Sequence, residues 1–446
     1  MYGDNYYLMP TALTIAGVDS GGGAGITADI KTFAALGVHG TCVITACTAQ
    51  NTREVKDIFD IPAEFVERQF DVVMSDIRVD CAKTGMLSSP EIVRTVARLI
   101  RKQNIPLVVD PVMAAGSGGK LLQDEAVDVM IDELLPLATI LTPNIFEAER
   151  LSGVKVRDMN DAKIAAAKIS DLGAKAVIVT GGHLDGTDVF YSNGEFTYIL
   201  GELIAGGTHG TGCTHSAAIT AELAKGTPLV EAAKRAKKFV ENAILTSVKI
   251  GRGAAPVNQL GHTLAEARRY GVLKTVEEAV ELIESNMDFS ELIPEVGCNV
   301  AMGIPNAALI SDVAAVSGRI VKLKGTPHAV GCVEFGASSH VARVVLTAMQ
   351  TDSSVRAAMN IRYSEEALVA CKEIGLKVAS FIRDEEPQGV STMEWGVGDA
   401  IQRSGRVPDV IFDTGDIGKE AMIRLLGTDA VEVVKQAFAI LSAMMR

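Results

Sequence analysis

The sequence lacks a Cys-x-x-Cys pair, and its seven cysteines are odd in number and widely scattered. This distribution argues against a disulfide framework or a zinc ribbon, and it fits a reducing cytoplasm. An apolar run of membrane-spanning length is also missing, and residues 1–10 are polar and aromatic rather than a signal peptide. We therefore expect a cytoplasmic protein with no membrane partner.

An excess of positive charge is missing as well. Lysine and arginine number 42 against 55 aspartates and glutamates, so the net charge is −13. This balance argues against nucleic acid and anionic membranes as partners, although a local basic pocket remains open. The 446 residues suit two or three domains, and a hydrophobic content of 48% supplies a sizeable core.

What the chain does contain is a recurring order of strand, turn and helix. Short apolar runs, each followed by a turn and a helix candidate, occupy residues 11–18, 107–112, 138–144 and 175–182. Continuous runs that alternate with helices predict an α/β fold with a parallel sheet covered on both faces. Ligands gather at the carboxyl ends of such strands, where Asp110, Asn144 and Gly181 lie.

A second α/β domain is predicted after a polar stretch. We place the first domain at 1–258, a linker at 259–274 and the second domain at 275–446. Thr275 and Glu278 have the spacing of a capping box and predict the start of a new helix. The predicted elements that follow are strands near 318–325, 330–335, 377–382 and 408–413, a helix over 340–348, and then helices to Arg446. No internal repeat relates the two halves.

The most informative stretch is residues 206–217, a Gly/Thr-rich loop that leads into an Ala-rich helix. From Thr208 onward the loop can direct backbone N–H groups at phosphate oxygens, and the positive end of the helix adds to this field. Cys213 lies where the field is strongest, so we expect its thiol to ionise more easily and to act as a base or nucleophile. The alternative is a buried structural cysteine.

Two further clusters have open interpretations. Gly21–Gly25 lacks the spacing of a dinucleotide-binding fingerprint, and it is either a turn that lets a substrate approach the backbone or a plain turn. Asp29 and Gln50 could read a heteroaromatic edge as a buried pair, or they could face solvent and end a strand. Asn144 and Glu147 offer oxygen ligands for Mg²⁺, or they form a helix cap.

Six motifs in order resemble hydroxymethylpyrimidine/phosphomethylpyrimidine kinases, a ribokinase-like family of thiamine synthesis with an α/β/α sandwich. The motifs are ALTIAGVDSGGGAGITADIKTFAALG (12–37), VITACTAQNT (43–52), KTGML (83–87), DPVM (110–113), LTPNIFEAE (141–149) and GGTHGTGCT (206–214). Sugar kinases and most pyridoxal kinases of this superfamily carry Asp in place of Cys213, which favours the pyrimidine branch.

This resemblance implies that ATP and Mg²⁺ phosphorylate an aminopyrimidine alcohol and then its monophosphate. Cys213 would be the general base, and the amides of Gly210, Thr211 and Gly212 would form the anion hole. The pyrimidine would be bound by Asp29, Gln50, Met86, Val112 and Gly21. The nucleotide and Mg²⁺ would be bound by Asn144, Glu147, Thr208 and Asp110. Thr180 stands where some relatives carry a phosphate-neutralising Lys, and Lys83 is a candidate replacement.

The second domain offers a separate cluster. Arg319 follows a glycine at a strand start and could clamp a diphosphate, and His340 follows a Gly/Ser-rich loop before a helix and could donate a proton. The stretches GCNVAMGIPNA (297–307), VSGRIVKLKG (316–325), EFGASSHVARVVLTAM (334–349), MNIRYSEE (359–366) and FDTGDIGKE (412–420) resemble ThiN-type thiamine-phosphate synthase domains. Arg319 and His340 match the catalytic positions of that family. Further candidates for binding are Asn306, Arg362 and Asp416.

The resemblances imply a bifunctional enzyme. The first domain would make a pyrimidine diphosphate, and the second would join it to a thiazole phosphate, which gives thiamine phosphate and diphosphate. The alternative is a pyrimidine kinase whose second domain senses thiamine phosphate without catalysis. The implied partners are these small molecules and ATP, and similar kinases tend to be homodimers or higher homo-oligomers.

Overall fold

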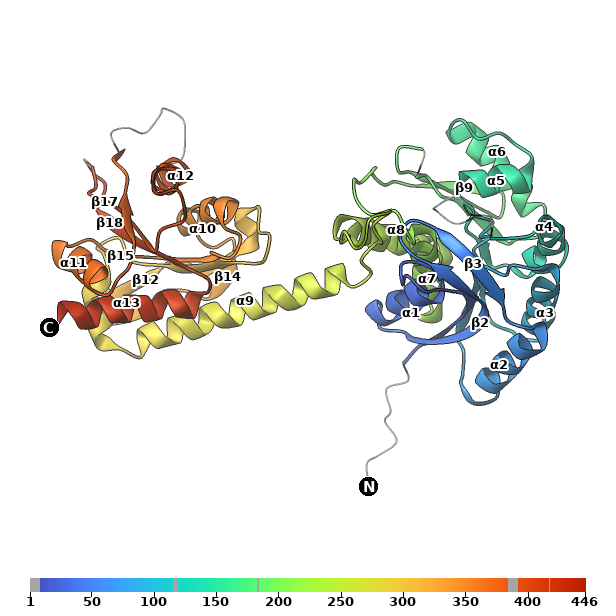
Figure 1. The fold of residues 1–446 in the computed structure, drawn as a ribbon, viewed down its shortest axis with the longest axis horizontal. Helices are drawn as coiled ribbons and strands as arrows, with labels where there is room; N and C mark the ends of the chain where they lie inside the picture. The colour runs from blue at the N-terminus through green and yellow to red at the C-terminus, as the bar shows by residue number, and fades with distance from the viewer. Residues whose placement is uncertain (1–8, 115–118, 120, 183, 384–391, 417) are drawn as a thin grey trace, which may run out of the picture. The chain divides into compact units, whose positions relative to one another are not determined.

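The computed structural model describes residues 9–114, 119, 121–182, 184–383, 392–416 and 418–446. The chain forms two compact units, which divide between Leu264 and Ala265 (Figure 1). Each unit has its own sheet and its own hydrophobic clusters. The prediction that residues 1–10 are not a signal peptide concerns a segment of which residues 1–8 lie outside the described residues.

The first unit is built on a nine-stranded sheet of order β3-β2-β1-β4-β5-β6-β7-β8-β9. The strands from β2 to β7 run parallel, whereas β3, β8 and β9 are antiparallel to their neighbours. The strands are β1 (Thr11–Asp19), β2 (His39–Gln50), β3 (Val55–Asp60), β4 (Cys81–Thr84), β5 (Leu107–Val109), β6 (Ile140–Leu141), β7 (Ala176–Val179), β8 (Asp188–Ser192) and β9 (Glu195–Ile199).

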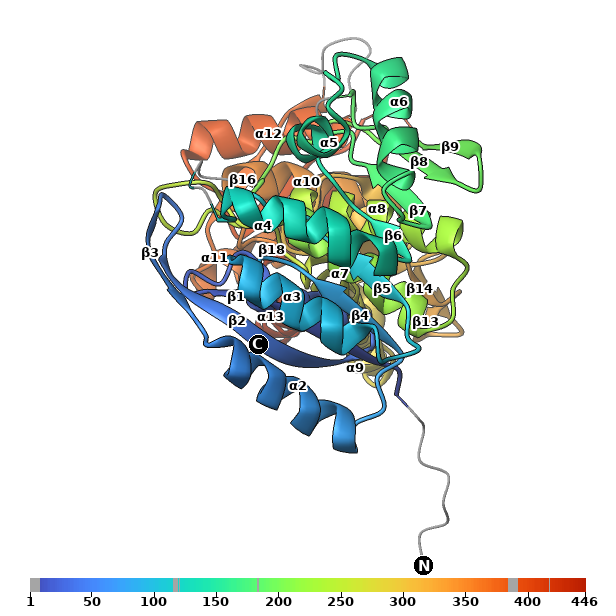
Figure 2. The ribbon, with the colours of Figure 1, turned by 90° about the vertical axis from the view of Figure 1, so that its right-hand side faces the viewer.

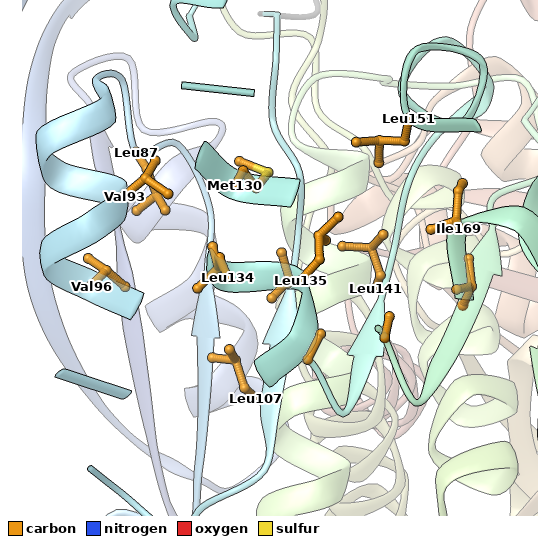
Figure 3. Packing of buried hydrophobic residues seen from close by; sticks show 14 of the residues in the cluster. Leu87, Val93, Val96, Leu107, Met130, Leu134, Leu135, Leu141, Leu151 and Ile169 are labelled. Carbon is orange, nitrogen blue, oxygen red and sulfur yellow. The ribbon is translucent and has the colours of Figure 1, made fainter. Parts of the chain in front are cut away.

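Helices cover both faces of this sheet. The helices are α1 (Gly25–Ala35), α2 (Ala63–Asp76), α3 (Pro90–Ile100), α4 (Asp124–Val129), α5 (Ile145–Ser152), α6 (Met159–Ser170), α7 (Thr211–Ala224) and α8 (Leu229–Leu245), with short turns η1 (Met130–Leu134) and η2 (Leu135–Leu137). Helices α2 to α6 line one face (Figure 2), and α1, α7 and α8 line the other. Figure 3 shows Leu107 and Leu141 of the sheet packed near Leu134 and Leu135.

Burial on both faces explains why these strands are continuous apolar runs. All of β1 except Val18 is buried, as are β4, β5, β6 and β7. The expected α/β fold with a mostly parallel sheet is confirmed. One detail differs: Thr227-Pro228 predicts an N-cap at Thr227 with proline at the first helical position, but Pro228 is itself the N-cap residue of α8.

The second unit has a seven-stranded sheet of order β14-β11-β10-β15-β18-β17-β16 and a separate hairpin of β12 and β13. Only β16 and β17 pair in parallel. The strands are β10 (Val300–Gly303), β11 (Val313–Val316), β12 (Ile320–Leu323), β13 (Thr326–Ala329), β14 (Val333–Phe335), β15 (Ala357–Arg362), β16 (Val378–Ser380), β17 (Val410–Asp413) and β18 (Met422–Gly427).

Helices again lie on both faces of the second sheet (Figure 1). Helices α10 (Ser339–Thr351) and α12 (Thr392–Ser404) pack on one face, and α9 (Gly261–Glu284), α11 (Glu365–Glu373) and α13 (Ala430–Met444) on the other. The turns η3 (Met287–Leu292) and η4 (Ile310–Asp312) complete the unit.

Two predictions for the second half are wrong. No new helix starts at Thr275: helix α9 already begins at Gly261, and the Thr275 hydroxyl donates to the Gly271 carbonyl within it. Strand β18 was predicted as part of a helical tail, because a segment of six residues that is buried on both faces has no period that separates strand from helix. The domain limits at 258 and 275 remain predictions.

None of the described helices combines the length and the apolar character that a membrane-spanning helix needs.

Candidate active sites

Two glycine-rich loops of the first unit meet at the end of β1. Asp19 accepts hydrogen bonds from the N–H groups of Gly23 at 3.1 Å and Ala24 at 2.9 Å. Its Oδ2 atom also lies 2.9 Å from Nε2 of His209. Burial acts to raise the pKa of Asp19, but the bond to His209 and the backbone N–H groups lower it overall. The Asp19–His209 pair therefore ties the turn at 20–25 to the loop at 206–212.

Gly210 brings these loops into direct contact. Its φ of 83° lies in the left-handed region, and a Cβ atom there would stand 1.8 Å from the Gly23 carbonyl oxygen. Only glycine allows both this angle and this approach. Gly210 is the N-cap of the 14-residue helix α7, and the exposed Thr208 precedes it. The amides of residues 210–212 thus lie at the positive end of a helix, as the anion-hole prediction requires.

A methyl group at position 210 should therefore disrupt the anion hole. We expect Gly210→Ala to weaken ATP binding by roughly 10-fold or more, since a strained left-handed residue alone costs about 1–3 kcal/mol. Gly226 is a matched control, because it has a φ of 80° at the other end of α7 and no atom within 4 Å of an added Cβ. Calorimetric titration with nucleotide compares the two variants, and equal affinities would contradict the role given to Gly210.

Cys213 lies in the first turn of α7, and the prediction that its thiol ionises easily is wrong. Burial is the largest effect and raises the pKa of Cys213 to about 12. The positive charge of Lys83 lowers the pKa, but the negative charges of Asp110 and Asp29 oppose it. Desolvation of a thiolate therefore outweighs the helix end, and Cys213 is a protonated thiol in the ligand-free protein.

A buried ion pair lies close to this thiol. Lys83 Nζ is 2.8 Å from Asp29 Oδ1, and both side chains are 0% exposed. The Thr14 hydroxyl donates to the other oxygen of Asp29 at 2.6 Å. Burial alone would lower the pKa of Lys83, but Asp29, together with Cys213 and Asp110, raises it. The charge of Lys83 is thus already matched by Asp29, which leaves it less available to compensate for the lysine missing at Thr180.

Removal of one member of this pair should destabilise the first unit. We expect Lys83→Met to lower the free energy of unfolding by about 3–5 kcal/mol, because Asp29 would remain as an unpaired buried charge. The double variant Lys83→Met/Asp29→Asn should recover part of this loss. Urea unfolding measures both, and equal stability of the single and double variants would show that pairing with Asp29 is not what Lys83 provides.

The carboxyl ends of β5 and β6 bring Asp110 and Glu147 together. Asn144 and Glu147 form a capping box at the start of α5: Asn144 Oδ1 accepts from the Glu147 N–H at 3.0 Å, and Glu147 Oε2 accepts from the Asn144 N–H at 2.9 Å. The prediction that Asn144 and Glu147 form a helix cap is therefore confirmed. Burial and then the charge of Asp110 raise the pKa of Glu147 to about 8. Two buried carboxyl groups that repel each other are a donor set that fits a divalent cation.

The described residues contain no group of three or more His, Cys, Asp or Glu side chains placed to hold a metal ion. In phosphoryl-transfer sites, Mg²⁺ is typically bound by one or two carboxylates together with waters and substrate phosphates. Asp110 also accepts a hydrogen bond from the Ser216 hydroxyl at 2.9 Å.

The remaining predicted pyrimidine contacts lie around the turn at 20–25. Gln50 does not pair with Asp29: its Oε1 accepts from Thr48, while its backbone carbonyl accepts from the Ser20 hydroxyl. Gly21 is adjacent to this carbonyl: a Cβ atom added to Gly21 would lie 3.4 Å from the Gln50 carbonyl oxygen. Two apolar candidates are farther along the chain, with Met86 buried and Val112 half-buried.

In the second unit, Arg319 and His340 lie in one electrostatic neighbourhood. His340 is exposed at the start of α10, yet partial enclosure of its ring lowers the pKa to about 4. Nearby guanidinium groups add to this effect, namely those of Arg424, Arg383 and Arg319. His340 is therefore neutral near pH 7 and can donate a hydrogen bond, but it is a poor reservoir for a proton. Arg319 is exposed, has a φ of 86°, and donates from Nη1 to the Val296 carbonyl.

Three weaker candidates are also at the surface of the second unit. Asn306 is exposed with a φ of 63°, Arg362 is exposed at the end of β15, and Asp416 forms backbone hydrogen bonds with Lys419. Their roles in binding remain predictions.

Sequence reasoning missed several charged residues at these sites. Asp19 and His209 carry a usable signal, since each stands beside a glycine-rich loop. Arg383, Asp413 and Arg424 have no such signal, because strand pairing and a loop bring them together from distant parts of the chain.

Comparison with known proteins decides the family. The family described as phosphomethylpyrimidine kinase matches residues 19–258, which is more than half of the chain. This protein belongs to the phosphomethylpyrimidine kinase family. The family described as thiamine-phosphate synthase ThiN matches residues 275–439, so the chain carries a ThiN domain as well.

One relative matches both parts of the chain, and another matches the kinase part. The bifunctional thiamine biosynthesis protein ThiDN of Methanocaldococcus jannaschii is 37% identical over 433 residues, which cover 95% of this chain and 96% of the relative. The hydroxymethylpyrimidine/phosphomethylpyrimidine kinase of Rhizobium meliloti is 48% identical over 255 residues, which cover 55% of this chain and 96% of the relative.

Solved structures match the kinase part. An ADP complex of Bacillus subtilis pyridoxal kinase is 38% identical with a TM-score of 0.54, and the match covers 57% of this chain and 99% of that one. Staphylococcus aureus pyridoxal kinase in complex with ADP is 37% identical with a TM-score of 0.54, and the match covers 57% and 94%. This phosphomethylpyrimidine kinase family member thus shares its first fold with nucleotide-binding kinases.

Proposed function

We propose that the chain is a bifunctional enzyme of thiamine synthesis, with a pyrimidine kinase in the first unit and a thiamine-phosphate synthase in the second. One observation carries the proposal: a relative named as a bifunctional thiamine biosynthesis protein matches 95% of this chain, from one unit through the other. The two families matched in the same order support the same conclusion.

The kinase step rests on the loop before α7. ATP would place its transferred phosphoryl group at the amides of residues 210–212, and the substrate alcohol would lie against the turn at 20–25. Cys213 would accept the proton of the alcohol. It could do so only as the thiolate, and burial raises the pKa of Cys213 to about 12, so a small fraction of the protein carries this base at neutral pH. The pyrimidine would contact Asp29, Gln50 and Met86.

Asp110, which follows β5, and Glu147, in the first turn of α5, would hold Mg²⁺. The cation supplies charge neutralisation between the phosphate groups when it is bound. These two side chains would anchor it through direct or water-mediated contacts, and Asn144 would keep Glu147 in place through the capping box.

The synthase step requires a site that favours departure of a diphosphate. Arg319 would bind phosphate oxygens, and neutral His340 would donate a hydrogen bond to the leaving group. Asn306, Arg362 and Asp416 would contact the rest of the substrates. The alternative of a non-catalytic sensor predicts that thiamine phosphate binds the second unit but is not made there.

The test uses the full chain. With ATP, Mg²⁺, the aminopyrimidine alcohol and the thiazole phosphate, thiamine phosphate should accumulate, and it should also form from the pyrimidine diphosphate without ATP. Kinase turnover without thiamine phosphate would favour the sensor. Because two of the similar structures are pyridoxal kinases, pyridoxal is tested as a competing alcohol, and faster turnover of pyridoxal would refute the pyrimidine assignment. Light scattering tests the expected homodimer.

A further inference from the structure

A segment at residues 253–259 lies against the loop that precedes α7. The His209 N–H donates to the Ala255 carbonyl at 3.2 Å, and the Val257 N–H donates to the His209 carbonyl at 3.1 Å. These bonds form an isolated parallel bridge between His209 and Pro256. The segment therefore binds both backbone groups of His209, immediately before the amides of the proposed anion hole.

The same segment binds the chain again just after these amides. Gln259 Nε2 donates to the Thr214 hydroxyl at 3.0 Å, and both residues are buried, with exposed fractions of 4% for Gln259 and 0% for Thr214. The Thr214 N–H in turn donates to the Gly210 carbonyl at 2.9 Å and closes the first turn of α7. Residues 210–213, which carry the amides and the thiol, thus lie between two residues that the segment holds.

The segment is itself fixed to other parts of the first unit. The Gly253 and Ala254 N–H groups donate to the hydroxyl and carbonyl oxygens of Thr52, just after β2, at 3.1 and 2.9 Å. The Asn258 side chain donates to the Thr246 carbonyl at the end of α8 at 3.2 Å. A segment that is fixed in this way can set the position of the loop that it contacts.

Gln259 is not among the site residues that the sequence predicts. It comes directly after the residues matched to the phosphomethylpyrimidine kinase family, 19–258, and it falls in the stretch predicted as a linker. A polar side chain in a linker is usually exposed to water. The buried hydrogen bond of Gln259 to α7 instead gives this side chain a place in the first unit.

We propose that Gln259 is a positioning residue for phosphoryl transfer. It would hold the first turn of α7 so that the amides of residues 210–212 and the Cys213 thiol face the same reacting group. Donors that are fixed in advance toward developing charge stabilise the transition state more than the bound substrates. A small displacement of such groups lowers the rate with little change in binding. The inference rests on the proposed kinase step, but not on which alcohol is phosphorylated.

The test compares Gln259→Leu, which has a similar volume and no amide, with wild type in the full chain. We expect kcat for the aminopyrimidine alcohol to fall about 10- to 100-fold, while KM for the alcohol and for ATP changes by less than about threefold. Asn258→Ala is the matched control, because it removes the neighbouring amide, which donates to the Thr246 carbonyl instead. It should keep kcat near the wild-type value even if thermal unfolding shows that it is less stable.

A second pair of variants tests the same hydrogen bond from the other side, and it remains informative if Gln259→Leu does not fold. Thr214→Ser keeps the hydroxyl and should retain most of kcat, whereas Thr214→Val removes it and should lose about as much as Gln259→Leu. Because both changes break one bond, the double variant Gln259→Leu/Thr214→Val should be no slower than the slower single variant. Formation of thiamine phosphate from pre-formed pyrimidine diphosphate should be unchanged throughout.

Three results would overturn the inference. They are an unchanged kcat in folded Gln259→Leu and Thr214→Val, an equal loss of kcat in Asn258→Ala, and additive losses in the double variant. If wild type phosphorylates pyridoxal in place of the pyrimidine, the same comparison is made with pyridoxal, so the two failures are distinguishable. A wild-type chain that phosphorylates neither alcohol would refute the kinase step and this inference with it.

Discussion

Replacement of Cys213 by alanine should lower the turnover of the pyrimidine kinase by roughly 10²- to 10⁴-fold, the usual worth of a general base. Nucleotide affinity should change little, because the amides of residues 210–212 belong to the backbone. Steady-state assays with the aminopyrimidine alcohol measure turnover, and calorimetry with an ATP analogue measures binding. Thr220→Val, two turns farther along α7, is a control for a small change in the same helix, because its hydroxyl donates to the backbone carbonyl of Ser216.

The pH dependence of turnover sharpens this prediction. Burial raises the pKa of Cys213 to about 12, so the thiolate fraction increases with pH throughout the accessible range. Wild-type turnover should therefore rise from pH 7 to pH 9, and Cys213→Ala should lack this rise. An unchanged rate in Cys213→Ala would remove the thiol as the base, whereas a lost rate with a retained rise would place the titrating group elsewhere.

Loss of Arg319 should nearly abolish the synthase and spare the kinase. We expect Arg319→Ala to reduce formation of thiamine phosphate by roughly 10²- to 10³-fold, as for removal of one donor to developing negative charge. His340→Ala should have a similar effect. The readout is thiamine phosphate made from pre-formed pyrimidine diphosphate, which bypasses the first unit.

Matched variants keep this result interpretable. Arg319 has a φ of 86°, so Arg319→Gly keeps the turn and removes only the side chain, and it should be as inactive as Arg319→Ala. His340→Asn retains a hydrogen-bond donor and should keep more activity than His340→Ala if the ring donates to the leaving group. Full synthase activity in folded Arg319→Gly would exclude a role for this guanidinium.

The first sheet was predictable because each of its central strands is a continuous apolar run that ends in a turn. Strand β1 was predicted within one residue of its limits. The edge strands β3 and β9 were missed, since most of their residues are exposed and carry no burial pattern. In the second unit, β18 was missed because it is buried throughout and follows a polar loop.

The residues of the sites also divide into those that sequence could place together and those that it could not. Gly210 and Cys213 share one loop, so the sequence alone places them together. The effect of burial on Cys213 was not predictable, because Lys83, Asp29 and Asp110 approach the thiol from three other elements. The Arg383–Asp413–Arg424 cluster depends on register between β17 and β18 and on a loop, and neither is visible before the strands are paired.

The hydrogen bond between Asp19 and His209 should couple the binding of the alcohol to the binding of the nucleotide. The turn that would hold the alcohol and the loop that would receive the phosphoryl group are fixed by one carboxylate, so neither can be ordered independently of the other. Binding of the first reactant orders both loops and loses conformational entropy, and the second reactant then binds without this loss. The two reactants should therefore bind synergistically, and this synergy should vanish in Asp19→Asn.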